Sequence, residues 1–474
     1  MDLQGLSVLL DGYNLQLSQG TGIKTYGLSL IEALDSLGAD VWVLFSRRIR
    51  TSSDPVLQEV LFFDNPPTRR FSLSHLSGTP AAGLTSIRGA MATEWSSAGR
   101  QVLMNRILDD SVWPVGILRH VSEAFAVAGS FVRGTRAKEL PTAGRKVLFD
   151  RDVEAFIGHV GILNLRDCFR LANLRRKFFG SATQLSMPRQ IDVWHATMPL
   201  PMRVKGAIQI TTVHDLIPLR LPYTTLDDKR AFYANVKESL KHSTLIIVDS
   251  EHTKRDLLDF FDADSDRIQV IHLPVRMKAP AQDLRTVSGC LWKYGLTFGH
   301  YILFVSAVEP RKNVGRLIDA YNAIETRMPL VIVGKRTWGW ESDLAGKRLD
   351  NVRLLEHVRG EDLAHLYTGA YCFVLPSLYE GFGLPALEAM ACGCPVIVSD
   401  VSSLPEVCGS AALYVDPYDV ADIKKKVEFL LNDPKARAGY AEAGLERAGL
   451  FSLDRYKKEL HGAYVRALGM QRGV

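Results

Sequence analysis

The stretch SLYEGFGLPALEAMACGCPVIVSD, residues 377–400, carries the clearest structural pattern in the chain. Two carboxylates, Glu380 and Glu388, stand eight positions apart, and two glycines between them let a ligand approach the backbone closely. Pro385 favours the first turn of a helix, where the N–H that proline lacks would have no helical partner. A helix N-terminus offers free N–H groups and a partial positive charge, which suit a diphosphate. The stretch therefore predicts a strand–turn–helix that binds a diphosphate beside sugar or ribose hydroxyls.

Strands and helices alternate on both sides of this stretch. Apolar runs predict strands at residues 301–305, 330–333, 352–355, 372–375 and 396–399, with helices at 314–324, 361–370, 385–392 and 419–431. An earlier series has strands at 6–10, 41–45, 192–195, 208–213, 245–248 and 268–271, and helices at 23–37 and 254–261. A polar stretch, 278–289, separates the two series as a linker. The sequence thus predicts an α/β protein with two doubly wound domains that face each other across a cleft.

Composition restricts the class of protein further. The chain has 474 residues, of which 47% are apolar and 23% charged, so disordered, collagen-like and coiled-coil proteins are excluded. No apolar run reaches the roughly 20 residues of a membrane-spanning helix, and the first residues lack the pattern of a secretion signal. The 6 cysteines include no CxxC pair, which argues against a disulfide framework and against a zinc ribbon. We expect a cytoplasmic protein.

The positive charge is concentrated in one part of the chain. Residues 65–190 hold 18 Lys+Arg and 9 Asp+Glu, a net charge of +9, and the chain as a whole carries +5, which leaves −4 elsewhere. This segment includes the run Arg175, Arg176, Lys177 followed by two phenylalanines. It is interpreted as a basic, helical insert that contacts an anionic partner, with a membrane surface favoured over nucleic acid. The alternative is that its cations pair with acids elsewhere on the protein.

Two further motifs suggest binding chemistry, and a third only resembles a metal site. EPRKN, residues 309–313, follows a strand and places Arg311 beside Lys312, which suits a diphosphate clamp. His195 and His214 end two apolar strands, at the edge where α/β sheets bind ligands. The acidic run DADSD, residues 262–266, lacks the glycine and distal glutamate of a calcium loop and is interpreted as a solvated turn, so no metal site is expected.

Residues 377–400, followed by SLPE at 403–406, resemble the donor-site signature of the retaining glycosyltransferases of family 4, and HDLIPL at 214–219 resembles their bacterial mannosyltransferase-like members. The resemblance implies a GT-B fold of two Rossmann-like domains. Its E-x7-E pair falls on Glu380, which would contact the donor sugar, and Glu388, which would contact the ribose. By resemblance the catalytic residues are His195, Glu380, Arg311 and Lys312; the donor-binding residues are Gly22, Glu309, Gly381, Phe382, Gly383, Leu384 and Glu388; and His214 and Asp215 lie on the acceptor side.

The resemblance also implies the domain organisation and the reaction. Residues 1–280 would form an acceptor-side domain with the basic insert at about 65–190, residues 290–450 a nucleotide-sugar-binding domain, and residues 451–474 a helix that crosses back to the first domain. The expected reaction is metal-independent, retaining transfer of a sugar, with mannose as the leading candidate, from a nucleoside diphosphate sugar to a glycan or lipid-linked acceptor of a bacterial surface polysaccharide. The enzyme would need no cofactor and would lie in the cytoplasm or against the inner face of the cytoplasmic membrane. The alternatives are a sugar-nucleotide epimerase of the same fold and a polyanion-binding protein on an inactive scaffold.

Overall fold

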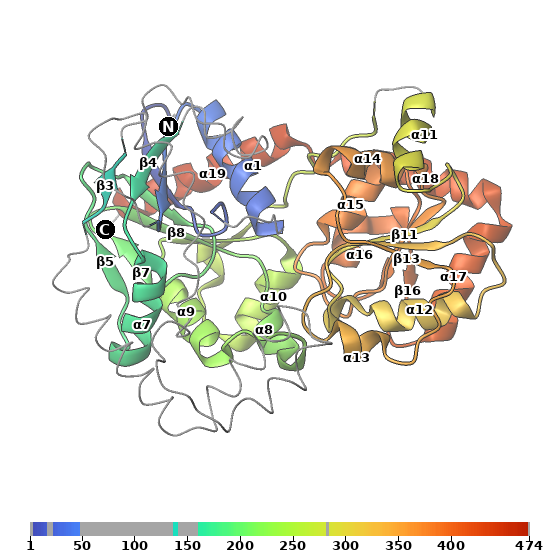
Figure 1. Cartoon of the computed structure of the whole chain (residues 1–474). Coiled ribbons are helices and arrows are strands. Elements are labelled where there is room, and N and C mark those ends of the chain that lie inside the picture. The colour runs from blue at the N-terminus through green and yellow to red at the C-terminus, as the bar shows by residue number, and fades with distance from the viewer. Residues whose placement is uncertain (1–2, 17–21, 48–135, 141–159, 281–283, 473–474) are drawn as a thin grey trace, which may run out of the picture.

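The N-terminal half is built on an eight-stranded sheet with a parallel core (Figure 1). The computed structural model describes residues 3–16, 22–47, 136–140, 160–280 and 284–472. The strand order is β10-β9-β8-β6-β1-β2-β4-β3, and among the described strands only the β3–β4 pair is antiparallel. The strands are β1 (Ser7–Asp11), β2 (Asp40–Phe45), β3 (Lys138–Glu139), β4 (Gly161–Asn164), β6 (Val193–Ala196), β8 (Ile208–Val213), β9 (Leu245–Val248) and β10 (Ile268–Val270). Apolar runs fill the central strands because both faces of the sheet are covered, as in other parallel sheets.

Helices and a small second sheet complete this half. The second sheet pairs β5 (Thr183–Leu185) with β7 (Met202–Val204) in parallel. The helices are α1 (Gly22–Ser36), α7 (Cys168–Phe179), α8 (Ile217–Arg220), α9 (Lys229–His242) and α10 (Glu251–Phe260), with the 3-10 turns η2 (Pro222–Thr224) and η3 (Ser265–Arg267). In η3, the Asp264 side chain accepts a hydrogen bond from the Asp266 amide, so the acidic run 262–266 forms a capped turn.

The C-terminal half is a six-stranded, fully parallel sheet in the order β13-β12-β11-β14-β15-β16. Its strands are β11 (Ile302–Val305), β12 (Leu330–Val333), β13 (Val352–Leu355), β14 (Cys372–Leu375), β15 (Val396–Ser399) and β16 (Ala412–Val415). Its helices and turns are α11 (Leu284–Lys293), η4 (Pro310–Lys312), α12 (Val314–Asn322), α13 (Trp340–Leu344), α14 (Gly360–Gly369), α15 (Leu384–Ala391), α16 (Leu404–Cys408), η5 (Gly409–Ala411), α17 (Val420–Asn432) and α18 (Pro434–Gly449). Two parallel α/β sheets with helices on their faces confirm the predicted fold class.

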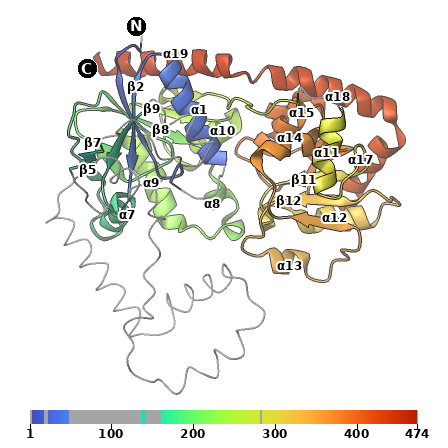
Figure 2. The same ribbon diagram turned by 45° about the horizontal axis from the view of Figure 1, so that its top comes forward.

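The last helix, α19 (Leu453–Arg472), follows α18 and runs from the C-terminal half across to the N-terminal half (Figure 2). It packs against α1 and β8, so the chain ends on the domain in which it began. Its buried side chains Tyr456, Leu460 and Tyr464 join the same apolar core as β1 and α1. Among the described residues, no helix is both long enough and apolar enough to span a membrane.

Two sequence expectations need correction. Residues 160–190 were expected within a basic helical insert, but β4 is a parallel partner of β2 inside the main sheet, and β5 belongs to the small sheet. The rest of the insert, apart from residues 136–140, lies outside the described residues. The expected linker 278–289 is half helix, because α11 begins at Leu284 and buries Val287, Cys290 and Leu291 against the second domain. The segment is polar on average, but its apolar residues lie on one face of the helix, so average polarity alone does not predict α11.

Candidate active site

A buried charged network lies at the carboxyl ends of β11 and β14, where an α/β sheet binds ligands. Glu380, 6% exposed, accepts hydrogen bonds at Oε1 from Lys312 Nζ and Ser377 Oγ, both at 2.7 Å. Its Oε2 lies 3.2 Å from Arg311 Nη1. The second terminal nitrogen of Arg311 donates to Glu309 Oε1 at 2.7 Å. The structure therefore brings together four of the residues that the sequence predicts for the donor site.

The EPRKN segment is held in place by its backbone and by Asn313. Asn313 adopts a left-handed conformation, with φ of 60°, and its amide donates to the carbonyls of Pro376 and Pro417. The Arg311 carbonyl accepts from the Leu378 amide, and Arg311 Nη1 donates to the Tyr379 carbonyl. These bonds dock the short η4 turn against the strand end that carries Glu380. The two cations are thus fixed relative to the carboxylate before any substrate binds.

The network keeps Glu380 ionised. Burial alone would raise its pKa, but the charges of Lys312 and Arg311, with hydrogen bonds from Lys312 and Ser377, lower the pKa of Glu380 to about 2. Burial lowers the pKa of Lys312, and Arg311 beside it acts in the same direction. The pKa of Arg311 is raised by Glu380 and Glu309 against the effect of burial. Glu380 is consequently a permanent acceptor, and both predicted clamp cations already pair with carboxylates.

The glycine-rich turn sits directly against the other domain. A side chain at Gly381 would lie 2.7 Å from the carbonyl oxygen of His214 and 2.9 Å from Asp215 Cβ. Ser250, at the N-terminus of α10, donates from Oγ to the Gly381 carbonyl at 2.9 Å. Gly383 precedes α15 with φ of +102°, a conformation that favours glycine. Only glycine at position 381 allows the two domains to approach this closely.

Glu388 lies one turn inside α15, the predicted donor helix, where it contacts Tyr367 of α14. It is half-buried, and its Oε2 accepts a hydrogen bond from the Tyr367 hydroxyl at 3.2 Å. Burial raises the pKa of Glu388 to about 7, and the Tyr367 hydrogen bond opposes this only in part. The two glutamates of the motif therefore differ in charge at neutral pH, a difference that their spacing does not reveal.

His214 forms a buried ion pair that the sequence analysis missed. Its Nδ1 lies 2.6 Å from Asp249 Oδ2, and its Nε2 lies 2.9 Å from the Thr197 carbonyl oxygen. Both partners are acceptors, so each ring nitrogen must carry a proton, and the ring is a cation. Burial alone would lower the pKa of His214, but the charge and hydrogen bond of Asp249 raise it. Asp249 directly follows the buried strand β9, which is the signal that could have identified it.

The carboxylate of Asp215 in the first domain interacts electrostatically with Arg311 of the second domain. Burial raises its pKa, and Arg311 of the other domain opposes that effect. Its Oδ1 accepts from the Ile217 amide at 3.0 Å, which orients the carboxylate at the start of α8. The predicted acceptor-side pair, His214 and Asp215, is therefore in direct contact with the Gly381 turn and near the charged network.

His195 lies inside the first domain, beneath the last helix. The side chain is fully buried, at 0% exposure, and both ring nitrogens have partners inside the protein. Nδ1 lies 2.8 Å from the Tyr464 hydroxyl of α19, and Nε2 lies 2.8 Å from Thr212 Oγ1. Burial lowers the pKa of His195 to about 3, with the nearby charge of His214 acting in the same direction. In this structure His195 is a buried, neutral residue with both ring nitrogens in hydrogen bonds, and its contact with the donor sugar stays a prediction.

The remaining predicted donor residues lie on the turn and at the start of α1. Phe382 is buried beside His272 and Phe451, and Leu384 begins α15 half-exposed. Gly22 is the first residue of α1 and is exposed, with open space where a side chain would be. Residues 17–21, which precede Gly22, lie outside the described residues. Gly22 is thus not brought into contact with the charged network.

Two family models match the two halves of the chain. Residues 298–447 match the model described as glycosyl transferases group 1, and residues 134–278 match the model described as glycosyltransferase family 4. The O-antigen chain mannosyltransferase B of Escherichia coli is 38% identical over 280 residues, which is 56% of this chain and 71% of that protein. The serotype-specific mannosyltransferase WbdA of Escherichia coli is 32% identical over 246 residues, 47% of this chain but only 29% of that protein.

The fold agrees with solved structures of low sequence identity. A sucrose-phosphate synthase from Thermosynechococcus elongatus aligns with a TM-score of 0.58 at 18% identity, covering 98% of this chain and 99% of that one. WaaG, a glycosyltransferase involved in lipopolysaccharide biosynthesis, aligns with a TM-score of 0.55 at 14% identity, covering 97% and 99%. These likenesses support the predicted GT-B arrangement of two Rossmann-like domains. The 38% identity to mannosyltransferase B over 71% of that protein, together with the group 1 match, shows that the chain belongs to the group 1 glycosyltransferases and is an enzyme that transfers sugars.

Proposed function

We propose that this enzyme is a retaining, family 4 mannosyltransferase that uses a nucleoside diphosphate mannose, without a metal ion, to extend a glycan or lipid-linked acceptor of a bacterial O-antigen. The observation that carries the proposal is the fixed network of Lys312, Arg311 and Glu380, next to the N-terminus of α15 and facing His214 of the other domain. The sugar and the biosynthetic role come from the name of the relative that is 38% identical.

In this proposal the protein itself neutralises the leaving diphosphate. Arg311, Lys312 and the helix N-terminus supply positive charge where charge develops in the transition state. The His214 cation adds to this field from the opposite domain. Glu380 stays anionic and accepts hydrogen bonds from the sugar hydroxyls, while Glu388 accepts from the ribose.

Retention fits attack on the face of the sugar from which the diphosphate departs. The bond from the anomeric carbon to the phosphate oxygen breaks as the bond to the acceptor oxygen forms, and the departing phosphate oxygen takes the acceptor proton. A covalent intermediate on Glu380 is disfavoured, because its oxygens are already bound by Lys312, Ser377 and Arg311.

The decisive experiment is a transfer assay with GDP-mannose, UDP-glucose and dTDP sugars on a mannose-containing acceptor. We expect transfer from GDP-mannose, an α-configured product by NMR, and activity that survives EDTA. An inverted product, or activity lost in EDTA and restored only by magnesium or manganese, contradicts the mechanism. Epimerisation of the donor without acceptor would favour the epimerase alternative.

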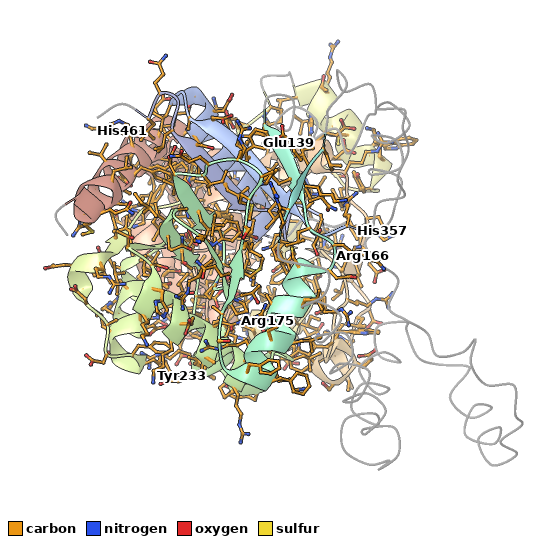
Figure 3. The ribbon with its side chains drawn as sticks, turned by 90° about the vertical axis from the view of Figure 1, so that its left-hand side faces the viewer. Glu139, Arg166, Arg175, Tyr233, His357 and His461 are labelled. Atoms are coloured by element: carbon orange, nitrogen blue, oxygen red, sulfur yellow. The ribbon has the colours of Figure 1, made fainter. Side chains whose placement is uncertain are left out.

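Exposed aromatic residues on α7 and α9 bear on where the enzyme is located. We propose a cytoplasmic enzyme that attaches peripherally to an anionic membrane surface through the face made by α7 and α9. Phe178 and Phe179 end α7 and are 40% and 60% exposed, and Tyr233 of α9 is 39% exposed. Figure 3 labels Arg175 on α7 and Tyr233 on the adjacent α9. Exposed aromatic groups beside cations are what an interfacial contact requires.

A further inference from the structure

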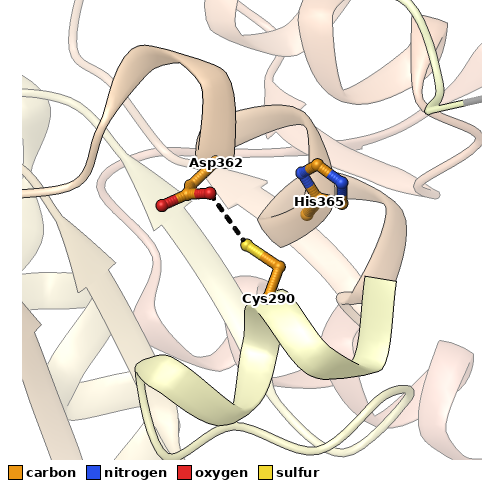
Figure 4. Close-up of side chains that lie close together, drawn as sticks. All are labelled: Cys290, Asp362 and His365. Carbon is orange, nitrogen blue, oxygen red and sulfur yellow. Dashed lines mark hydrogen bonds between the residues drawn. The ribbon is translucent and has the colours of Figure 1, made fainter. Parts of the chain in front are cut away.

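Three side chains with different metal-binding atoms converge between α11 and α14. The sulfur of Cys290, a carboxylate oxygen of Asp362 and a ring nitrogen of His365 all lie within 4.8 Å of one another. Cys290 and Asp362 are buried, and His365 is half-buried. Figure 4 shows Cys290 on one helix, Asp362 and His365 on the other, and the 3.1 Å hydrogen bond from Cys290 Sγ to Asp362 Oδ1.

The two helices place these groups by regular geometry. Asp362 and His365 are three positions apart on α14, so they share one face of that helix. That face packs against α11, which contributes Cys290. The Tyr294 hydroxyl donates to Asp362 Oδ2 at 2.8 Å, so Oδ1 is the oxygen that is turned toward the sulfur. Outer hydrogen bonds of this kind orient the ligands of protein metal sites.

The mixture of ligand atoms indicates which metal the site suits. Magnesium and calcium prefer oxygen ligands alone, whereas zinc binds sulfur, nitrogen and carboxylate oxygen together. Zinc bond lengths of about 2.0–2.3 Å put neighbouring ligand atoms about 3.5 Å apart, so a contraction of about 1 Å completes the geometry. Lys293 Nζ lies 3.7 Å from Asp362 Oδ1, but its side chain is 57% exposed and can turn to solvent when a metal supplies the positive charge.

We propose that Cys290, Asp362 and His365 form a zinc site of three protein ligands, with water as the fourth. On binding, the sulfur–zinc bond forms and the thiol proton passes to solvent. The ion would fasten α11 to α14, and α14 also carries Tyr367, which donates to Glu388 at 3.2 Å. The site is separate from the proposed transfer chemistry and would stabilise the donor-binding domain.

Cobalt(II) titration of the full-length, tag-free protein tests this proposal, because cobalt replaces zinc and gives visible and near-ultraviolet absorption. We expect one cobalt per chain, a thiolate charge-transfer band, and displacement by zinc. Cys290→Ser should abolish that band, and His365→Ala should weaken binding at least about tenfold. Tyr294→Phe, which removes only an outer hydrogen bond, should weaken it by about 10–100-fold. His300→Ala, an exposed histidine of the same domain, is the matched control and should change nothing.

The results that overturn the proposal are equally specific. They are the absence of stoichiometric binding, a charge-transfer band that persists in Cys290→Ser, or equal losses in His365→Ala and His300→Ala. Circular dichroism without metal shows whether each variant is folded. Because His365 is only half-buried, His365→Ala still tests the proposal if Cys290→Ser is unstable. A zinc-dependent rise in melting temperature in wild type, lost in His365→Ala, provides a readout that requires no activity.

Discussion

At the scale of single residues, Lys312 has the most direct expected role, because its ammonium group is 2.7 Å from Glu380 and is itself buried. Lys312→Ala should lower turnover about 10²-fold or more, the cost of removing one group that stabilises charge in the transition state. Steady-state kinetics with the nucleotide sugar measure this. Lys424→Ala on α17, a surface lysine paired with Glu428, is the control. A turnover close to wild type in a folded Lys312→Ala protein contradicts the clamp.

Glu388 should make nucleotide binding depend on pH. Burial raises its pKa to about 7, so its carboxylate gains charge as the pH rises through that value and then accepts ribose hydrogen bonds more strongly. Affinity for the nucleoside diphosphate should therefore increase from pH 6 to pH 8 in wild type, and this component should be missing in Glu388→Gln. Calorimetry of both proteins across this range separates the effect of Glu388 ionisation on affinity from the effect of nucleotide ionisation, which both proteins share. Identical pH profiles would falsify the assignment.

The same raised pKa has a consequence for stability. An acid with a higher pKa in the folded state than its ordinary 4.5 binds more protons when folded. The contribution of Glu388 to the free energy of unfolding is therefore greatest at low pH, and it declines as the pH rises from about 4.5 to about 7. Replacement of Glu388 by Gln should remove that decline, which melting curves over the same range detect.

Asp249 should act through His214. Asp249→Asn removes the main influence that raises the pKa of His214, so burial then lowers it and the ring loses its charge. If the His214 cation assists transfer, turnover of Asp249→Asn should fall by about 10²-fold. As the pH rises, the remaining activity should be lost at a lower pH than in wild type, because His214 then loses its proton at a lower pH. A pH–rate profile tests this, with Asp262→Asn in the exposed acidic turn as the control. Reduced turnover with an unchanged profile would indicate a purely structural role.

At the scale of elements, the N-terminus of α10, which Ser250 caps, is also bound by a carboxylate of the other domain. Glu406 of α16 accepts from the amides of Glu251 and His252, at 2.9 and 3.2 Å, and from His272 Nε2 at 2.7 Å. Burial alone would raise the pKa of Glu406, but these hydrogen bonds and the His272 interaction lower it. A carboxylate at a helix N-terminus is stabilising by about 0.3–2 kcal/mol.

Glu406→Gln should accordingly destabilise the protein by about that amount at neutral pH. Because an acid with a lowered pKa stabilises only above its ordinary value of 4.5, the difference from wild type should shrink as the pH falls below it. Calorimetric unfolding at several pH values measures this difference. Glu428→Gln on α17 is the matched control, since its partner Lys424 is a neighbour on the same helix. A difference that grows on acidification contradicts this role of Glu406.

Some helices and strands could be predicted from the sequence, and others could not. The strands at 330–333, 372–375 and 396–399 are found at their predicted positions, because a buried parallel strand is a continuous apolar run. Helix α9 escaped notice because its sequence KRAFYANVKESLKH is largely polar and buries few side chains. The hydrogen bond between His195 and Tyr464 could not be predicted either, because the two residues are 269 positions apart and sequence spacing carries no information over that distance. The charges of Glu380 and Glu388 likewise depend on tertiary neighbours.

At the scale of the whole molecule, the proposed membrane face can be tested with vesicles. Arg175, Arg176 and Lys177 lie on α7, and Arg176 also pairs with Glu238 at 2.8 Å, which ties α7 to α9. Replacement of all three by Gln should weaken binding to anionic vesicles, since each cation near such a surface contributes about 1 kcal/mol.

The matched control replaces the lysine run 424–426 of α17 by Gln, which removes the same charge from the other domain. Sedimentation at low salt should show stronger binding of wild type to anionic than to neutral vesicles, and a loss only in the α7 variant. Equal binding to both vesicle types, or equal losses in both variants, rules out this face.

The bond between His195 and Tyr464 also bears on how the protein is made. A ribosome releases the N-terminal sheet long before it synthesises α19, at about 5–20 residues per second. Until then His195 lacks its Nδ1 partner, and the surface of α1 that α19 covers is exposed. Co-translational folding of the first domain therefore stays incomplete until the last helix emerges. A nascent chain stalled before residue 453 should therefore expose this part of the first domain to chaperones and proteases.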